Sequence, residues 1–253
     1  SALIFSLLTS VGVAVIMFII NKGRISERLG VEGMDRKSED SITEREILTA
    51  EKTGTRIHIA HVSTAGSVDI IRKAKARGVN VTCETCPHYF MMTDEKLLSR
   101  DADYRMNPPL REETDRKAIE EAVCDGTIDC IVTDHAPHSK EEKSDFLKAP
   151  NGIVGLETSF AAVLTGLYHT GKISLEKVID IMAVKPREIL GLPQEKIQKG
   201  ARANIVLADL EKEWTVDPEK FKSKGRNTAF KGMKLRGRPV GTITDGKLRY
   251  MEK

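Results

Sequence analysis

The segment Ile128–His138, IDCIVTDHAPH, joins a buried-strand pattern to a cluster of polar side chains. Its first part, Ile128–Val132, is apolar and rich in β-branched residues, which predicts a strand buried in a parallel sheet. Its end supplies an acid, Asp134, and two imidazoles, His135 and His138. Because ligands of α/β folds bind at the carboxyl ends of parallel strands, we expect chemistry here. Taken alone, the same residues also fit a capping aspartate beside two solvated histidines.

Two further strands are predicted upstream, and both end in polar residues. The segment 56–62 ends at His61, and the segment 79–85 ends at Glu84 and Thr85. Apolar periodicity, with glycine or proline at several ends, predicts helices over residues 41–53, 64–77, 112–125, 156–169 and 174–190. Strands that alternate with helices predict an α/β fold with a parallel sheet.

The composition excludes some classes of protein. The chain has 253 residues, 40% of them hydrophobic and 30% charged, which is typical of a globular protein. Forty basic residues against 37 acidic ones give a net charge of +3, so there is no electrostatic case for nucleic-acid binding. The pair Cys83 and Cys86 resembles half of a zinc site, but no second pair occurs at a suitable spacing. The four cysteines fit a reducing cytoplasm.

The beginning of the chain has an anomalous composition. Ala2–Ile20 carries no charge and is long enough to span a bilayer. The basic residues Lys22 and Arg24 would then place the rest of the chain in the cytoplasm. Three interpretations stay open: a membrane anchor, a buried segment of a larger fold, or a chain start that is not natural. We expect residues 1–22 to form a segment distinct from the rest of the chain.

The end of the chain changes character at Lys199. Residues 203–210 and 241–251 are predicted to be short strands, and the second contains a hairpin turn at Asp245-Gly246. The predicted organisation is therefore an apolar segment (1–22), a main α/β region (23–198) and a small β-rich region (199–253).

The ends of the three predicted strands suggest a metal site. If the strands are parallel neighbours, His61, Glu84 and Asp134 converge on one rim, and imidazole with carboxylate is the ligand set of hydrolytic zinc sites. Asp134 could also carry a proton. Each residue has an ordinary alternative: His61 as a satisfied core histidine, and Glu84 as the partner of a nearby base. We interpret His58 as structural.

Other polar residues are candidates for holding a substrate. Asn107 and Arg111 lie in an irregular stretch with two adjacent prolines. Arg111 could grip a carboxylate with two hydrogen bonds, or could be a plain surface residue. His138 could donate a hydrogen bond to the same ligand.

Five stretches, in this order, resemble the second half of a dihydroorotase of the bacterial class I type: HVSTAGSV, TCETCPHY, YRMNPPLR, TDHAPH and APNGIVGLET. That family belongs to the cyclic amidohydrolases, which are metal-dependent (β/α)8 barrels. The resemblance runs from about Gly23 to the C-terminus. It implies a partial TIM-type barrel with a small flanking β-rich region, and reversible conversion of dihydroorotate and N-carbamoyl-L-aspartate in pyrimidine biosynthesis, using zinc.

The resemblance also assigns roles to individual residues. It implies that His61 binds metal at the end of the sixth barrel strand. It implies that Asp134, at the end of the eighth strand, is both a metal ligand and the catalytic base. The positions that hold the substrate in the family correspond to Asn107, His138, Asn151 and Gly152.

The sequence departs from the family in its first half. The family's HxH pair, its bridging acidic or modified lysine residue and its fifth-strand histidine have no counterpart, so only His61 and Asp134 of the ligand set can be assigned. Three strands cannot close a barrel. We therefore expect a fragment or truncated gene product with little or no turnover alone. Another cyclic amidohydrolase (dihydropyrimidinase, hydantoinase or allantoinase) remains an alternative. So does a non-catalytic scaffold that binds aspartate transcarbamoylase; a homodimer is the other candidate assembly.

Overall fold

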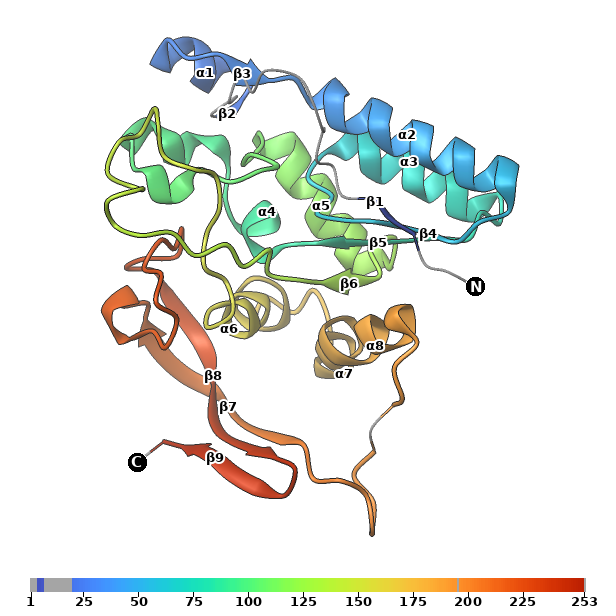
Figure 1. The fold of residues 1–253 in the computed structure, drawn as a ribbon, viewed down its shortest axis with the longest axis vertical. Helices are drawn as coiled ribbons and strands as arrows, with labels where there is room; N and C mark the ends of the chain where they lie inside the picture. Colours follow the sequence, from blue (N-terminus) through green and yellow to red (C-terminus); the bar gives the residue numbers. More distant parts are fainter. Residues whose placement is uncertain (1–3, 7–19, 195, 253) are drawn as a thin grey trace. The chain divides into compact units, whose positions relative to one another are not determined.

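The computed structural model describes residues 4–6, 20–194 and 196–252 (Figure 1). The chain forms two compact units. The first comprises Ser1–Glu157 together with Pro218–Ala229, and the second comprises Thr158–Asp217 together with Phe230–Lys253. The sequence-based boundaries after residues 22 and 198 stay predictions.

The first unit is built on a parallel sheet of four strands. Its order is β1 (Ile4–Ser6), β4 (Ile57–Ile59), β5 (Val81–Thr85) and β6 (Cys130–Ile131), and each neighbouring pair is parallel. The predicted α/β class is confirmed. No barrel closes among the described residues. The strands β4, β5 and β6 are shorter than the predicted segments 56–62, 79–85 and 128–132.

Three long helices of the first unit pack side by side in chain order. They are α2 (Arg36–Thr53), α3 (Ala65–Ala76) and α5 (Glu113–Asp125). Helix α2 packs against α3, and α3 against α5, as Figure 1 shows. The predicted apolar face of α3 is confirmed, since Ile71 is fully buried. These helices bury apolar side chains that would otherwise stay in water, which stabilises the sheet they cover.

The stretch before α2 contains more structure than expected. The polar, glycine-containing stretch 21–40 has the composition of a loop, yet it contains short strands, a helix and the start of α2. Asp35 caps α2 by accepting a hydrogen bond from the Lys37 amide, so the helix begins several residues earlier than predicted. The remaining short elements of the first unit are β2 (Ile20–Asn21), α1 (Arg24–Leu29), β3 (Gly33–Met34), α4 (Pro87–Met91), η1 (Asp94–Ser99), η2 (Ala102–Tyr104) and η5 (Pro218–Lys220).

The second unit contains two helical segments and an antiparallel sheet. The predicted helices are present, but each includes a π-helical turn: α6 (Ser159–Val163) with η3 (Leu164–Tyr168), and α7 (Leu175–Ile179) with η4 (Asp180–Val184) and α8 (Lys185–Leu190). The sheet order is β7 (Ile205–Thr215), β8 (Lys234–Thr244) and β9 (Lys247–Met251). The predicted turn at Asp245-Gly246 is confirmed, with φ of 54° and 70°.

Among the described residues, no helix combines the length and apolarity needed to cross a membrane. The apolar segment Ala2–Ile20 lies largely outside the described residues, so the three interpretations of it stay predictions.

Candidate functional site

The strand register places several polar side chains on one face of the sheet. His58 is aligned with Thr82, and Glu84 with Cys130. Aligned residues share a face, and alternate residues along a strand return to it. These four side chains therefore lie together, while the intervening residues face the helices.

His61 reaches the same group through an unusual backbone. Strict alternation from His58 would turn His61 to the opposite face. Instead, φ of His61 is 53°, in the left-handed region that residues with a side chain seldom adopt. Its Nε2 lies 3.4 Å from Oε1 of Glu84 and 3.8 Å from Oδ1 of Asp134. The left-handed backbone of His61 thus turns its imidazole toward Glu84 and Asp134, as the sequence predicted.

Asp134 shares this strained geometry, with φ of 45°. Non-glycine residues in this region cost roughly 1–3 kcal/mol each and cluster at functional sites. Burial raises the pKa of the Asp134 carboxyl above its usual value; the neighbouring His61 opposes the rise and Glu84 adds to it. The structure therefore brings the two predicted ligands together, and their roles as ligands stay predictions.

A buried histidine lies nearby. His88 is 1% exposed, and its Nε2 has no hydrogen-bond partner among the described residues. Burial, assisted by His61, lowers the pKa of His88 to about 3, so its ring is neutral. A neutral imidazole beside the rim offers a lone pair or a donor without adding charge.

The predicted substrate-binding residues after β6 also meet. Nε2 of His138 lies 3.1 Å from the carbonyl oxygen of Asn151. Gly152 comes next with φ of 135°, and a Cβ at this position would lie 2.6 Å from Cβ of Ala136 and 3.1 Å from Nε2 of His138. Only glycine fits there, so the loop after Asp134 and the Asn151-Gly152 segment form one surface.

Asn227 holds this surface together and was missed by the sequence analysis. Its amide nitrogen donates to the carbonyls of Ala136 (3.0 Å) and Gly152 (2.9 Å), and its Oδ1 accepts from the His138 amide (2.9 Å). Asn227 is 3% exposed. Its own sequence neighbourhood gives no signal for this role, because all three partners are distant in the chain.

Arg111 is buried and bonded to other residues of the chain. Its side chain is 2% exposed and forms an ion pair with Glu39 at 3.1 Å. It also donates to Oγ of Ser63 (3.1 Å) and to Oδ1 of Asn21 (3.0 Å). The interpretation as a plain surface residue is therefore wrong, and a role in gripping the substrate carboxylate stays a prediction.

Glu39 anchors the segment directly after His61. Its carboxylate accepts from the backbone amides of Ser63 (2.9 Å) and Thr64 (3.1 Å) and from both of their hydroxyls. Together with its ion pair to Arg111, the buried Glu39 carboxylate holds the backbone in place at Ser63, two residues after the predicted ligand His61. Thr64 also caps α3 by accepting a hydrogen bond from the Ser67 amide.

A loop near the predicted substrate residues is tied down by a lysine. Nζ of Lys143 donates to the carbonyls of Ala102 (3.0 Å), Arg105 (3.3 Å) and Pro150 (2.9 Å). Burial lowers the pKa of Lys143 to about 8. The side chain of Asn107 is exposed, and its role as a substrate ligand stays a prediction.

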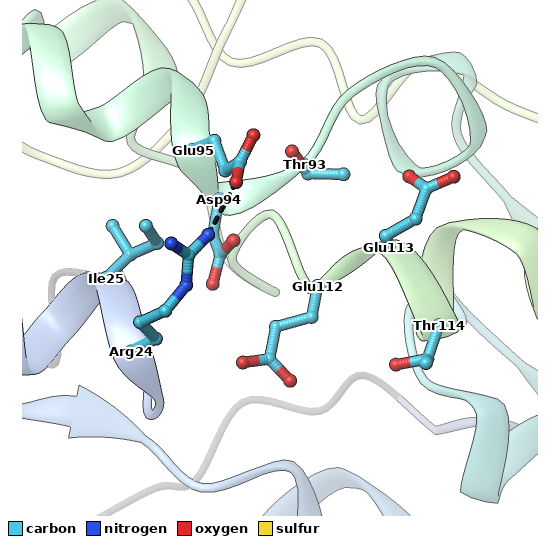
Figure 2. A pocket seen from close by; sticks show the side chains of 8 residues that line it. All are labelled: Arg24, Ile25, Thr93, Asp94, Glu95, Glu112, Glu113 and Thr114. Carbon is cyan, nitrogen blue, oxygen red and sulfur yellow. Dashed lines mark hydrogen bonds and ion pairs between the residues drawn. The ribbon is translucent and has the colours of Figure 1, made fainter.

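A separate cavity of about 460 Å³ lies near α1 (Figure 2). Arg24 pairs with Glu95 across it at 2.6 Å, and burial raises the pKa of Asp94 in its wall. None of the predicted site residues lines this cavity, so it is distinct from the rim formed by His61 and Asp134.

Comparison with known proteins shows where the chain belongs. The sequence profile described as "Amidohydrolase family" matches residues 39–249. A dihydroorotase of Pelotomaculum thermopropionicum is 46% identical over 231 residues, which is 91% of this chain and 54% of that protein. A dihydroorotase of Bacillus subtilis is 46% identical over 234 residues, covering 92% of this chain and 55% of that protein. The chain thus spans about half the length of these curated relatives.

Solved structures give a consistent result at lower identity. The dihydropyrimidinase from Brevibacillus agri superposes with a TM-score of 0.80 at 29% identity, over 86% of this chain and 49% of that one. The L-hydantoinase from Arthrobacter aurescens gives a TM-score of 0.79 at 31% identity, over 85% and 49% of the two chains.

Proposed function

The chain belongs to the amidohydrolase family, and from this we propose that it forms the second half of a dihydroorotase. The identity of about 45% to dihydroorotases supports this choice over the dihydropyrimidinase and hydantoinase neighbours, which are 29–31% identical. In this proposal the parallel sheet β1-β4-β5-β6 is part of a (β/α)8 barrel, and its carboxyl ends form the active-site rim.

The observation that carries the proposal is the approach of His61 to Asp134. Two ligands that lie 2.0–2.2 Å from one zinc ion at a tetrahedral angle are about 3.4 Å apart. The measured separation of 3.8 Å between Nε2 and Oδ1 closes to this value with a small side-chain movement. Imidazole and carboxylate are also the donors of hydrolytic zinc sites. The residues present therefore fit zinc, and in this proposal His61 and Asp134 would hold it.

The proposed reaction adds water to the amide carbonyl of dihydroorotate and gives N-carbamoyl-L-aspartate. A zinc ion would supply Lewis acidity at that carbonyl. Asp134 takes a proton from the attacking water and delivers it to the departing amide nitrogen. Its partly buried position, which raises its pKa, suits a carboxyl group that must be neutral at one stage and ionised at another.

The substrate carboxylate would be held by neutral and cationic donors beyond the rim. His138 and the Asn151-Gly152 segment form one surface, which Asn227 joins by hydrogen bonds. Asn107, which is exposed at the neighbouring loop, adds an amide donor in this proposal. We expect substitutions of these residues to raise the KM for dihydroorotate more than they weaken the affinity for zinc.

The test joins this chain to the first half of the Bacillus subtilis dihydroorotase and measures turnover of dihydroorotate and dihydrouracil. The proposal predicts faster cleavage of dihydroorotate, and loss of at least about 100-fold in kcat for Asp134→Asn, since general base catalysis contributes 10²–10⁴-fold. Faster cleavage of dihydrouracil would favour a dihydropyrimidinase instead. The 253-residue chain alone should bind metal but turn over little substrate.

The proposal places the protein in the cytoplasm, with a small molecule as its substrate. A homodimer and a complex with aspartate transcarbamoylase remain the two candidate assemblies. Size-exclusion chromatography with light scattering, with and without the transcarbamoylase, separates them. A non-catalytic scaffold would co-elute with that partner and show no metal binding.

A further inference from the structure

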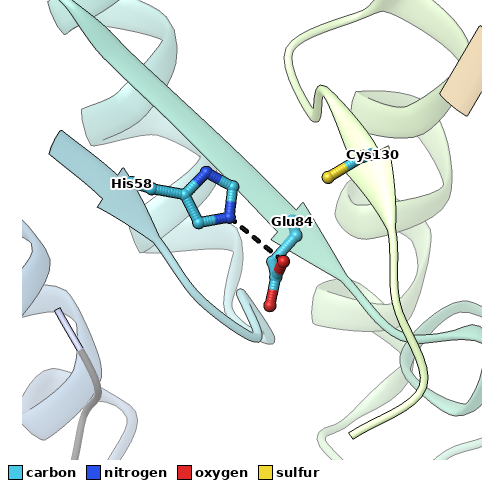
Figure 3. Close-up of side chains that lie close together, drawn as sticks. All are labelled: His58, Glu84 and Cys130. Carbon is cyan, nitrogen blue, oxygen red and sulfur yellow. Dashed lines mark hydrogen bonds and ion pairs between the residues drawn. The ribbon is translucent and has the colours of Figure 1, made fainter. Parts of the chain in front are cut away.

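A second cluster of metal-ligand types lies one step earlier along the same strands (Figure 3). His58, Glu84 and Cys130 come from β4, β5 and β6, and their ligand atoms all lie within 4.8 Å of one another. We propose that these three side chains form a second cation site, suited to zinc and similar thiophilic ions. This site goes beyond the proposed function, which uses only His61 and Asp134 of this chain as metal ligands.

The strand register itself creates this cluster. Glu84 and Cys130 are aligned on neighbouring strands, and His58 is aligned with Thr82, one alternation before Glu84. All three ligands therefore share a face whatever rotamers they adopt. Figure 3 shows the three side chains converging from separate strands.

The hydrogen bonds of His58 prepare its ring for a cation. Nδ1 lies 2.8 Å from Oγ1 of Thr82, and that hydroxyl is oriented toward the carbonyl of Ile57 at 3.5 Å. When the hydroxyl donates to the carbonyl, its oxygen accepts the Nδ1–H of His58. Without an ion, the other tautomer lets Nε2 donate to Oε2 of Glu84 at 3.1 Å; with the proton on Nδ1, Nε2 and Oε2 can both turn to a cation. A cation between them satisfies both, and an outer partner on Nδ1 is the usual arrangement for a histidine ligand.

The donor set determines which ions fit. One nitrogen, one oxygen and one sulfur leave a fourth position open on a tetrahedral ion. A thiolate favours zinc over magnesium or calcium, which prefer oxygen ligands. Cys130 is 2% exposed and His58 is 1% exposed, so the route for the ion passes Glu84, the half-buried member. Binding displaces the thiol proton to solvent.

Glu84 links this cluster to the rim. Its Oε2 faces His58, while its Oε1 lies 3.4 Å from Nε2 of His61. The carboxylate of Glu84 therefore lies between His58 of the second site and His61 of the rim. Occupation of the second site would withdraw Glu84 from His61 and so alter the rim.

The test uses metal alone and the whole chain. X-ray absorption of the zinc-loaded chain should show a sulfur shell at about 2.3 Å. Cobalt(II) should give a thiolate-to-metal charge-transfer band in the near ultraviolet at one equivalent of sulfur-bound ion per chain. A wild-type chain without a sulfur shell and without this band overturns the proposal, and this result requires no variant to fold.

Variants then identify the thiolate. Cys130→Ser should abolish the band, whereas Cys124→Ser and the buried control Cys86→Ser should keep it. A band that survives Cys130→Ser, or that depends on Cys86, contradicts the assignment. His61→Ala should leave the band intact, so failure of the proposed rim site and failure of this second site give different results.

Discussion

Nε2 of His61 lies 3.8 Å from Oδ1 of Asp134, and both residues hold left-handed backbone conformations. His61 lies two residues after β4 and Asp134 three residues after β6, and both strands belong to one parallel sheet, so the fold alone brings their segments to a common rim. The backbone strain then sets their side-chain directions. A fold retains such strain where the surrounding contacts enforce it. For His61 that enforcement comes from the buried network around Glu39.

Glu39→Gln should destabilise the protein. The change leaves the buried Arg111 side chain without the carboxylate with which it forms an ion pair. Breaking a buried ion pair by removing one partner costs about 3–5 kcal/mol. Urea unfolding at pH 7 measures this loss.

The control for that change is Glu51→Gln, which removes the exposed partner of Arg77. Solvent and salt screen this pair, so its unfolding midpoint should be close to that of the wild type. Equal midpoints for Glu39→Gln and Glu51→Gln would show that the buried network does not stabilise the fold.

Gly152→Ala should be more destabilising than Gly78→Ala. Both glycines have positive φ, 135° and 81°, so both changes introduce backbone strain. A Cβ at Gly152 also collides with Ala136, whereas a Cβ at Gly78 meets no atom of the described residues within 4 Å. We expect an additional cost of about 1–3 kcal/mol at Gly152. Equal unfolding free energies for the two variants would refute the steric argument.

His88 should make stability depend on pH. Its folded pKa of about 3 is below the ordinary value of 6.5, so below pH 6.5 the unfolded chain binds a proton that the folded chain does not. The stabilisation is therefore complete above pH 6.5 and is lost as the pH falls toward 3. The slope is about 1.4 kcal/mol per pH unit.

To isolate this effect, the unfolding free energies of the wild type and His88→Leu are compared between pH 6 and pH 4. A metal chelator is present in both measurements. Taking the difference removes the contribution of other titrating groups. The wild type should lose stability relative to the variant as the pH falls. Parallel curves would mean that His88 is protonated in the folded chain.

Much of the site could be predicted because strand ends are set by local patterns. The apolar run that ends at Asp134 and the alternating run that ends at His61 each mark a strand, and parallel pairing brings their ends together. The Asp245-Gly246 turn was equally accessible, because the two residues favour positive φ by themselves.

The partners of buried charges could not be predicted in the same way. Arg111 suggested a substrate ligand because no local pattern reveals that Glu39 approaches it. Asn227 was assigned to the β-rich region, yet its side chain bonds to the segments around His138 and Gly152. Such pairings form only when distant parts of the chain pack together. A short stretch of sequence therefore does not reveal them.

Removing either rim residue should weaken zinc binding at the rim and leave the proposed second site able to bind. His61→Ala and Asp134→Asn should each weaken affinity by about 100-fold or more, since losing even an outer-shell partner costs 10–100-fold. His169→Asn is the matched control, because that imidazole bonds to the carbonyl of Leu210 in the second unit. Calorimetric titration with zinc measures all three. If His169→Asn weakened the zinc affinity and the two rim variants did not, the ion would bind somewhere other than the rim.

The most direct test of the central claim is the anomalous diffraction of zinc in crystals of the chain. We predict a peak about 2.0–2.2 Å from both Nε2 of His61 and a carboxylate oxygen of Asp134. The absence of a peak within bonding distance of these two residues, in crystals that contain zinc elsewhere, would contradict the account.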